Sequence, residues 1–321
     1  MALAILLPAG VVLGQQVPGL DQFVRESVNT SVIVFFVLFG MAFTLPTGNI
    51  RTIASRPTGV IAAMLINTAL LPLISWGLVS VVPLGPFSSG LLILAAVPTT
   101  LASAAVWTRK AGGNDAIPLI VTLVSNALCF LTVPFWLTLT LGQSVPIEPV
   151  PLIQRLLIVA VLPMLLGQCC RAIPAMARFA TERKTMIGSV AQIGILTIIF
   201  VTSIRTGPIF DSHAEGLSLL QFVIVFFCGL FIHLVGLAAG WGLARAWKCD
   251  CADAIGVAFS ASQKTLPIAI EVATAPLILA SGISPVAIMP PLIYHATQLV
   301  VDTLMIAKFR KTCSDNAATN P

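Results

Sequence analysis

The residues best suited to chemistry form one polar cluster inside an otherwise apolar stretch, 251–274. The middle of that stretch holds hydroxyl, amide and ammonium groups beside a proline: Ser260, Ser262, Gln263, Lys264, Thr265 and Pro267. At membrane depth, irregular backbone is tolerated only inside protein or beside a water-filled cavity. A lysine at the centre of a membrane helix costs about 2.5–3.5 kcal/mol to insert and suggests a functional site by default. The stretch is therefore predicted to be a broken transmembrane helix whose break is a working site.

Lys264 has a second interpretation, because long basic side chains near a helix end reach back to the membrane interface. Lys264 lies near the middle of its stretch, where that escape is difficult. We therefore favour a role for Lys264 in the chemistry or the structure of the site.

Composition sets the class of protein. The chain has 321 residues, of which 57% are hydrophobic and 9% charged, and its mean hydropathy is +1.01. These values exclude a soluble domain and predict an all-α polytopic membrane protein with the lipid bilayer as its partner. The net charge of +5 does not indicate nucleic-acid binding, because the basic residues lie in short loops between apolar segments.

Apolar segments long enough to cross a bilayer recur along the whole chain. The predicted spans are 28–45, 57–82, 88–109, 116–141, 150–171, 185–207, 216–247, 251–274 and 285–308. Residues 1–14 are short for a span, which needs about 20 residues. They lack the basic start and cleavage site of a signal peptide, so a retained first helix is favoured over a signal-like segment. With it, the chain is one transmembrane unit, 1–321, of about ten helices.

Basic residues in the loops predict the orientation. Thirteen lie on one side: Arg51, Arg56, Arg109, Lys110, Arg171, Arg178, Arg183, Lys184, Arg245, Lys248, Lys308, Arg310 and Lys311. Three lie on the other side: Arg25, Arg155 and Arg205. This asymmetry places the C-terminus in the cytoplasm, with the protein in the plasma (inner) membrane.

The fourth predicted span has a polar, proline-containing break like that of the ninth. Its break contains Pro98, Thr99, Thr100 and Ser103. Each interrupted span is the fourth in a block of five, which makes 1–145 and 150–311 two repeats of opposite orientation. Matched breaks in inverted halves point to the binding site of a transporter, where broken helices 4 and 9 would cross. The hydroxyls either bind substrate or cap the broken helix ends.

Four runs of sequence carry a family resemblance. They are GMAFTLPTGNI (40–50), PTTLASAAVWTRKAGGND (98–115), ADAIGVAFSASQKTLPI (252–268) and MPPLIYHATQL (289–299). The chain resembles the bile acid:sodium symporter family, and most closely the branch of solute carrier family 10 member 7 and its bacterial homologues. The resemblance implies a panel domain of spans 1, 2, 6 and 7 and a core domain of spans 3–5 and 8–10.

The resemblance also implies two sodium sites at the crossing. Ser103 and Thr122 match the first site, but Ala104 replaces its asparagine, and Phe259 or Ser260 stands in place of its glutamate. The first site is therefore expected to be dismantled.

The second sodium site is expected to be partly kept. Asn67 and Gln263 match its amide ligands, and Lys264 lies next to them. We expect Lys264 to replace a sodium ion, either as a protonation site that couples transport or as a permanent charge that holds the crossing. No other metal site and no cofactor are expected, so the coupling ion is a proton or sodium.

Three further ionisable residues could exchange protons or charge with this site. Glu271 lies on the same helical face as Lys264 but near a span end, which favours a solvated carboxylate. Asp302 lies deeper in its span and is expected to pair with a polar neighbour on another helix. His295 is more readily explained by a structural hydrogen bond than by a proton relay.

The remaining polar and small residues have structural interpretations. His233 and the pair Gly236-x-x-x-Gly240 indicate close helix packing. The seven cysteines lie mostly in or beside apolar spans and lack zinc-site spacing, so reduced thiols are expected.

No enzyme motif is present: there is no nucleophile elbow, no His-Glu-x-x-His pair and no Walker-type phosphate loop. We expect a secondary-active transporter of a small organic solute, with an organic anion as the expected class. A sodium-coupled symporter, a channel and a non-transporting regulator of calcium homeostasis are the alternatives.

Overall fold

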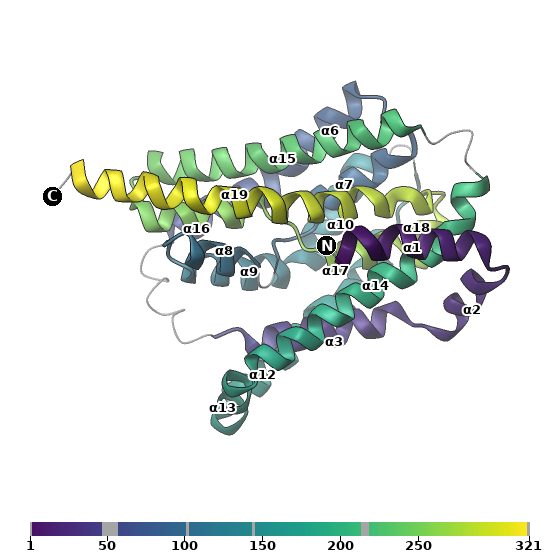
Figure 1. Cartoon of the computed structure of the whole chain (residues 1–321), viewed down its shortest axis with the longest axis horizontal. Helices are drawn as coiled ribbons and strands as arrows, with labels where there is room; N and C mark the ends of the chain where they lie inside the picture. Colours follow the sequence, from purple (N-terminus) through teal and green to yellow (C-terminus); the bar gives the residue numbers. More distant parts are fainter. Residues whose placement is uncertain (1, 47–56, 101–102, 143–144, 213–217, 320–321) are drawn as a thin grey trace.

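The computed structural model describes residues 2–46, 57–100, 103–142, 145–212 and 218–319, and every regular element in these ranges is helical (Figure 1). The first half contains α1 (Ala2–Gln16), α2 (Leu20–Ser27), α3 (Thr30–Thr44), α5 (Thr58–Leu65), α6 (Leu71–Val81), α7 (Ser88–Ala96), α8 (Ser103–Lys110), α9 (Ala116–Ala127) and α10 (Cys129–Leu141). The second half contains α11 (Pro149–Leu156), α12 (Leu162–Ala172), α13 (Pro174–Glu182), α14 (Lys184–Ser212), α15 (Leu219–Ala246), α16 (Cys251–Ser262), α17 (Leu266–Ala273), α18 (Pro276–Ala280) and α19 (Met289–Thr319).

Four short elements complete the described chain. Two are single π-helical turns inside longer helices, η1 (Ile66–Leu70) and η3 (Leu157–Val161). Two are 3₁₀ turns, η2 (Gly85–Phe87) and η4 (Pro285–Ile288).

The prediction of long apolar membrane helices is confirmed. Within the described ranges, four continuous helices are long and apolar enough to cross a bilayer: Thr58–Val81, Pro149–Ala172, Lys184–Pro208 and Leu219–Ala246. Two bent pairs, α2–α3 at 54° and α9–α10 at 65°, raise the number to six if each pair is one span. The other predicted spans are not continuous helices of sufficient length and hydropathy. The helix α1 is short, α7–α8 and α16–α17 are interrupted, and buried polar residues lower the hydropathy of α19.

The bend between α9 and α10 divides a segment that the sequence predicts as one straight span. No glycine or proline marks this position. Instead, the Asn126 amide donates to the carbonyl oxygen of Thr122 at 2.8 Å, one turn earlier in α9. Side chains that hydrogen-bond back to the preceding turn compete with the helical ladder and bend helices.

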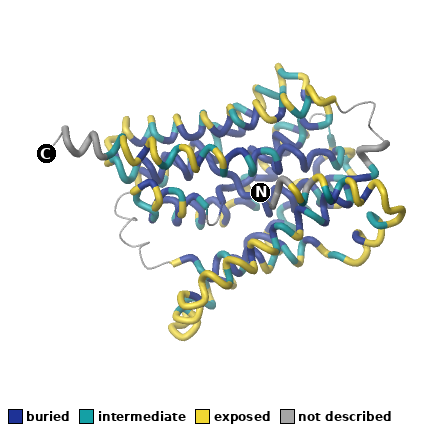
Figure 2. Tube along the Cα trace, in the orientation of Figure 1, coloured by how far each residue is buried: buried dark blue, intermediate teal, exposed yellow. Residues whose placement is uncertain are grey.

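The helices form two groups that pack mainly within themselves. The first group comprises α1, α2, α3, α12, α13 and α14, and the second comprises α5 to α10 with α15, α16, α17 and α19 (Figure 1). The groups touch where α17 meets α3, and where η4, which packs on α7, α17 and α19, meets α14; α11 packs against α10 and the adjoining η3. Buried positions concentrate on the inner sides of the helices, and α13 is almost entirely exposed (Figure 2).

Local capping explains where several helices begin. The Asn29 side chain accepts from two backbone N–H groups at the start of α3. Ser218 and Gln221 form a capping box that opens α15, and Asp250 caps α16. Such caps satisfy N–H groups that have no partner within the helix.

The sequence predicted close helix packing at two glycines of α15, and in the structure they allow α15 to lie directly against α16. A Cβ added at Gly236 would lie 2.8 Å from the Cα of Ser262, and one at Gly240 would lie 2.9 Å from the Cα of Ala258. Gly242, on the same helix, has nothing within 4 Å of such a Cβ. The close approach therefore places the C-terminal end of α16 beside α15.

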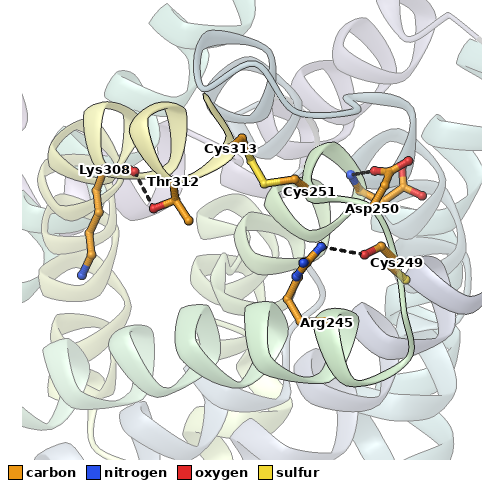
Figure 3. Close-up of a disulfide and its surroundings, with 8 residues drawn as sticks. Arg245, Cys249, Asp250, Cys251, Lys308, Thr312 and Cys313 are labelled. Atoms are coloured by element: carbon orange, nitrogen blue, oxygen red, sulfur yellow. Dashed lines mark hydrogen bonds between the residues drawn. A yellow bond between two sulfur atoms is a disulfide. The ribbon is translucent and has the colours of Figure 1, made fainter. Parts of the chain in front are cut away.

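A disulfide joins Cys251, at the start of α16, to Cys313 in α19 (Figure 3). Their Cα atoms are 5.7 Å apart, within the usual disulfide range. The expectation of reduced thiols is therefore wrong for this pair, because the fold places side by side two cysteines that are 62 residues apart in the sequence. The other five cysteines are free.

The last helix extends further than the sequence predicted. A span ending at 308 with a polar tail was expected, but α19 continues to Thr319. The tail contains no glycine or proline before Pro321, so nothing in it interrupts a helix.

Replacing Gly236 by alanine should destabilise the protein by about 1–3 kcal/mol, because the added methyl group meets the backbone of α16. Gly242→Ala is the matched control and should leave stability unchanged or slightly higher. Thermal unfolding of both variants in detergent measures the difference. Equal melting temperatures for the two variants would contradict this account of the α15–α16 packing.

Candidate solute and ion site at two helix breaks

The break between α7 and α8 lies against the break between α16 and α17. The backbone N–H of Thr265 donates to the carbonyl oxygen of Pro98 at 2.9 Å. The Ser103 hydroxyl donates to the Oε1 atom of Gln263 at 2.7 Å. The polar segments that the sequence placed in the fourth and ninth spans are therefore in direct contact.

Proline explains the position of each break. Pro98 disfavours helical backbone at the residue before it, and Val97 is extended with ψ at 154°. Pro267 lies in the first turn of α17, where its missing N–H does no harm, and Gln263 and Thr265 before it are extended.

Lys264 lies at the centre of this contact and is only 2% exposed. Its Nζ donates to the carbonyl oxygens of Asn67 and Ala95, both at 2.7 Å, and of Val97 at 2.9 Å. The side-chain oxygen of Asn67 is a fourth acceptor, at 3.2 Å. Among the described residues, no carboxylate lies within 4 Å of this ammonium.

The acceptors of Lys264 are carbonyl groups that their own helices leave unpaired. Those of Ala95 and Val97 are at the C-terminal end of α7, which carries partial negative charge. The carbonyl of Asn67 lies in the π-helical turn η1, where Leu71 donates to Ile66 instead. The next residue, Pro72, has no N–H, so the carbonyl of Asn67 has no helical donor.

Asn67 also closes the end of α16. Its amide nitrogen donates to the carbonyl oxygens of Ser260, Ala261 and Gln263 at 3.2, 3.1 and 2.9 Å. The amide group of Asn67 thereby satisfies the orphan carbonyls at the end of α16, while the side-chain oxygen and the backbone oxygen of Asn67 face Lys264.

The backbone of Lys264 is held by α19. Its N–H donates to the Oε1 atom of Gln298 at 3.1 Å, and the Gln298 amide donates to its carbonyl oxygen at 3.3 Å. The same amide lies 2.9 Å from the Nδ1 atom of His295. His295 therefore makes a structural hydrogen bond, as the sequence favoured, and Gln298 belongs to the site although the sequence did not indicate it.

A buried carboxylate extends the network on the other side. The Gln263 amide donates to Asp302 at 2.5 Å, and the His233 Nε2 atom lies 3.0 Å from the other carboxylate oxygen. The Tyr294 hydroxyl lies 3.4 Å from His233 Nδ1. The expectation that Asp302 pairs across helices is confirmed. Its partner is His233, for which the sequence had suggested only a role in packing. The sequence signal for this pair was that both ionisable groups lie in apolar spans.

Residues of α9 hold the α7–α8 break. The Thr122 hydroxyl donates to the carbonyl oxygen of Thr100 at 2.8 Å, and the Asn126 amide donates to that of Thr99 at 2.9 Å. The hydroxyl of Thr99 and the side-chain oxygen of Asn126 are buried without a partner. Sequence reasoning missed Asn126, although an amide in an apolar span was a usable signal.

Two serines of the predicted cluster donate their hydroxyl hydrogen bonds within their own helix and not to the other residues of the cluster. Ser260 donates to the carbonyl oxygen of Gly256 at 2.6 Å, and Ser262 donates to that of Phe259 at 3.3 Å. Both bonds lie within α16, so these hydroxyls support their own helix.

Glu271 lies outside this cluster, and the prediction that it is solvated is wrong. It is 1% exposed and pairs with Arg155 of α11 at 2.6 Å. The Ser31 hydroxyl of α3 donates to it at 3.1 Å. Packing of α17 against α3 buries the carboxylate, which a position near a span end did not reveal.

The candidate sodium ligands have their oxygens engaged elsewhere. Phe259 is fully buried among aromatic rings and offers no oxygen side chain. The side-chain oxygen of Asn67 faces Lys264, and that of Gln263 accepts from Ser103. In the described part of the chain, no cluster of three acidic, histidine or cysteine residues suited to a metal ion occurs.

Replacing Asn67 by alanine should destabilise the protein by several kcal/mol, because each buried carbonyl left without a donor costs about 1–3 kcal/mol. Ser75→Ala is the matched control, since Ser75 is also buried but its hydroxyl has no partner. Thermal unfolding in detergent is the measurement. A melting temperature for Asn67→Ala as high as that of Ser75→Ala would rule out this role.

Known proteins resemble the chain along most of its length. It is 28% identical to the probable sodium/metabolite cotransporter BASS4, chloroplastic, of Arabidopsis thaliana, over 95% of this chain and 71% of that protein. It is 24% identical to sodium/bile acid cotransporter 7 of Danio rerio, over 92% of this chain and 88% of that protein. The uncharacterized protein YbaS of Bacillus subtilis is 24% identical over 82% and 83%. The profile of the SBF-like CPA transporter family matches residues 1–311, so the chain belongs to that family.

Proposed function

We propose that this integral membrane protein is a secondary-active transporter of a small organic solute, expected to be an organic anion. Its family is one of transporters and not of enzymes. The observation that carries the proposal is the contact of two helix breaks around the buried ammonium of Lys264. The printed names of the relatives, sodium/bile acid and sodium/metabolite cotransporters, support a small organic solute.

The proposed mechanism is alternating access around the two breaks. The first group of helices, with α11, would be the panel and the second group the core. Ten spans in two inverted repeats would then place the crossing of α7–α8 and α16–α17 near the membrane midplane. The polar contacts of Glu271 in α17 with Ser31 of α3 and Arg155 of α11 support a boundary along which two bodies can separate.

Lys264 would replace the sodium ion of such a crossing. Two unit charges about 4 Å apart repel by about 4 kcal/mol at an effective dielectric constant of about 20. At about 1.4 kcal/mol per decade, that weakens sodium binding roughly a thousandfold. The side-chain oxygens of Asn67 and Gln263 already accept hydrogen bonds, which also disfavours sodium binding there.

Two roles of Lys264 are compatible with its contacts. Its protonation and deprotonation would make it the coupling step of proton-driven transport. A permanent charge bonded to three backbone carbonyls would instead hold the crossing rigid. The names of the relatives favour a third candidate, a sodium-coupled symporter. Its ion would bind at a residual site formed by Asn67 and Gln263.

Replacing Lys264 by methionine should abolish concentrative uptake and leave uptake down a gradient, if protonation of Lys264 is the coupling step. The assay is uptake into proteoliposomes, under proton or sodium gradients, of a solute selected by a thermal-shift screen of organic anions. Lys184→Met, at an exposed position, is the control.

The outcomes separate the candidates. A folded but uncoupled Lys264→Met protein supports coupling through Lys264, whereas loss of folding supports the rigid role. Saturable sodium dependence of the wild type with Lys264 dispensable would contradict the replacement of sodium. Equilibration without accumulation by the wild type would indicate a channel, and absence of any flux a regulator.

Replacing Glu271 by glutamine should favour the state that is open on the side of Arg25, Arg155 and Arg205. The reason is that the ion pair with Arg155 joins the two helix groups, and breaking a buried pair costs several kcal/mol. A cysteine introduced at Thr274 should then react with a membrane-impermeant maleimide at least about tenfold faster, since about 1.4 kcal/mol changes a population tenfold. Glu26→Gln, which changes an exposed carboxylate, is the control, and labelling unaffected by Glu271→Gln would reject this gate.

A further inference from the structure

A cavity separate from the Lys264 cluster lies between the two helix groups. Its volume is about 170 Å³, several times the roughly 30 Å³ that one water molecule takes up in the liquid. Its polar lining comes from α2, α14 and the residue that follows α17: Arg25, Thr202, Arg205, Thr206 and Thr274. Two guanidinium groups and three hydroxyl groups therefore surround one space.

The positive charge of this cavity is poorly compensated. Arg205 bonds to the carbonyl oxygens of Val24 and Val28 and lies 3.5 Å from the Thr30 hydroxyl, all neutral groups. Among the described side chains, no carboxylate lies within 4 Å of it. Arg25 has Asp21 at 3.8 Å, but this pair is largely exposed and contributes little.

Two polar atoms of the lining are buried without a partner. They are the Nε atom of Arg205 and the Oγ1 atom of Thr202, a residue that is only 2% exposed. Each atom exposes less than 1 Å² of surface, so a ligand in the cavity reaches it only after a side-chain rotation, and that contact would remove the roughly 1–3 kcal/mol that a buried group without a partner costs. A guanidinium N–H and a hydroxyl group are both donors suited to an oxyanion.

We infer that this cavity binds the oxyanion headgroup, a carboxylate, sulfonate or phosphate, of a small organic molecule. Arg205 and Arg25 supply the charge, and Thr202 supplies a hydrogen bond through its free hydroxyl.

The location of the cavity gives the anion a place in transport. All three arginines of the predicted outer side meet the α2–α3 corner, residues 24–31. An anion held between α14 and α17 would lie at the outer mouth of the boundary between panel and core. The binding site stands on its own contacts, whereas its use as the entry site of the transported solute rests on the proposed function.

The test is anion binding by the purified full-length protein in dodecyl maltoside. Sodium benzoate, sulfate and phosphate are titrated against sodium chloride at matched ionic strength, and thermal stabilisation is followed. At least one oxyanion should stabilise the wild type saturably. Arg25→Gln should weaken its apparent affinity about tenfold, and Thr202→Val about three- to tenfold, as expected for losing a charged and a neutral hydrogen bond.

Thr202→Val is the decisive variant, because it removes a hydroxyl that has no partner and should not lower the melting temperature without ligand. Arg205→Gln is avoided, since its guanidinium also bonds the end of α2. Arg178→Gln, an exposed change on α13, should bind as the wild type does. Absence of saturable stabilisation, or equal binding by all variants, would overturn the site.

A second arm distinguishes a free anion from a lipid headgroup. Short-chain phosphatidylglycerol is titrated in the same way, with phosphatidylcholine as its neutral counterpart. Stabilisation by phosphatidylglycerol alone, lost in Thr202→Val, would assign the oxyanion site to a lipid and overturn its use by a solute. Because no flux is measured, failure here leaves the proposed transport untouched, and intact anion binding without any uptake would count against transport alone.

Discussion

The structure depends on one buried ammonium group held by the open ends of helices. A charge removed from water carries a penalty of several kcal/mol unless other groups solvate it. For Lys264 this solvation comes from backbone carbonyls of α7 and η1, not from a carboxylate. Such carbonyls exist only where a helix is interrupted, so the charge and the breaks require each other. Continuous helices here would leave Lys264 without acceptors, and an apolar residue at 264 would leave three buried carbonyls without a donor.

The same requirement explains the neighbouring irregularities. The π-helical turn η1 and Pro72 free the carbonyl of Asn67, and the Asn67 side chain closes the end of α16. Gln298 fixes the backbone at Lys264 from a third helix. Each irregularity supplies a partner to another, which stabilises an arrangement that would be costly in lipid if any one part were missing.

The boundary between the two helix groups has a different character. Among the described residues, its polar contacts are few and carried by side chains, as in the pair of Glu271 with Arg155, and it contains a cavity lined by arginine and threonine. Water can replace such contacts when the groups separate, whereas the backbone bonds around Lys264 join elements of a single group. A hydrogen-bonded centre beside a boundary of side-chain contacts is the combination that the proposed alternating access requires.

The sequence by itself determined the membrane-helical class, the two interrupted segments and the position of Lys264 at one of the breaks, because hydropathy, proline and an ionisable residue in an apolar run act locally. It also indicated the glycines that bring α15 against α16 and the need of Asp302 for a partner. Only the tertiary structure decided which groups meet: His233 with Asp302, Asn126 with Thr99, Glu271 with Arg155 and Cys251 with Cys313. These partners are far apart along the chain, and burial of Glu271 depends on how α17 packs against α3, which no local pattern encodes.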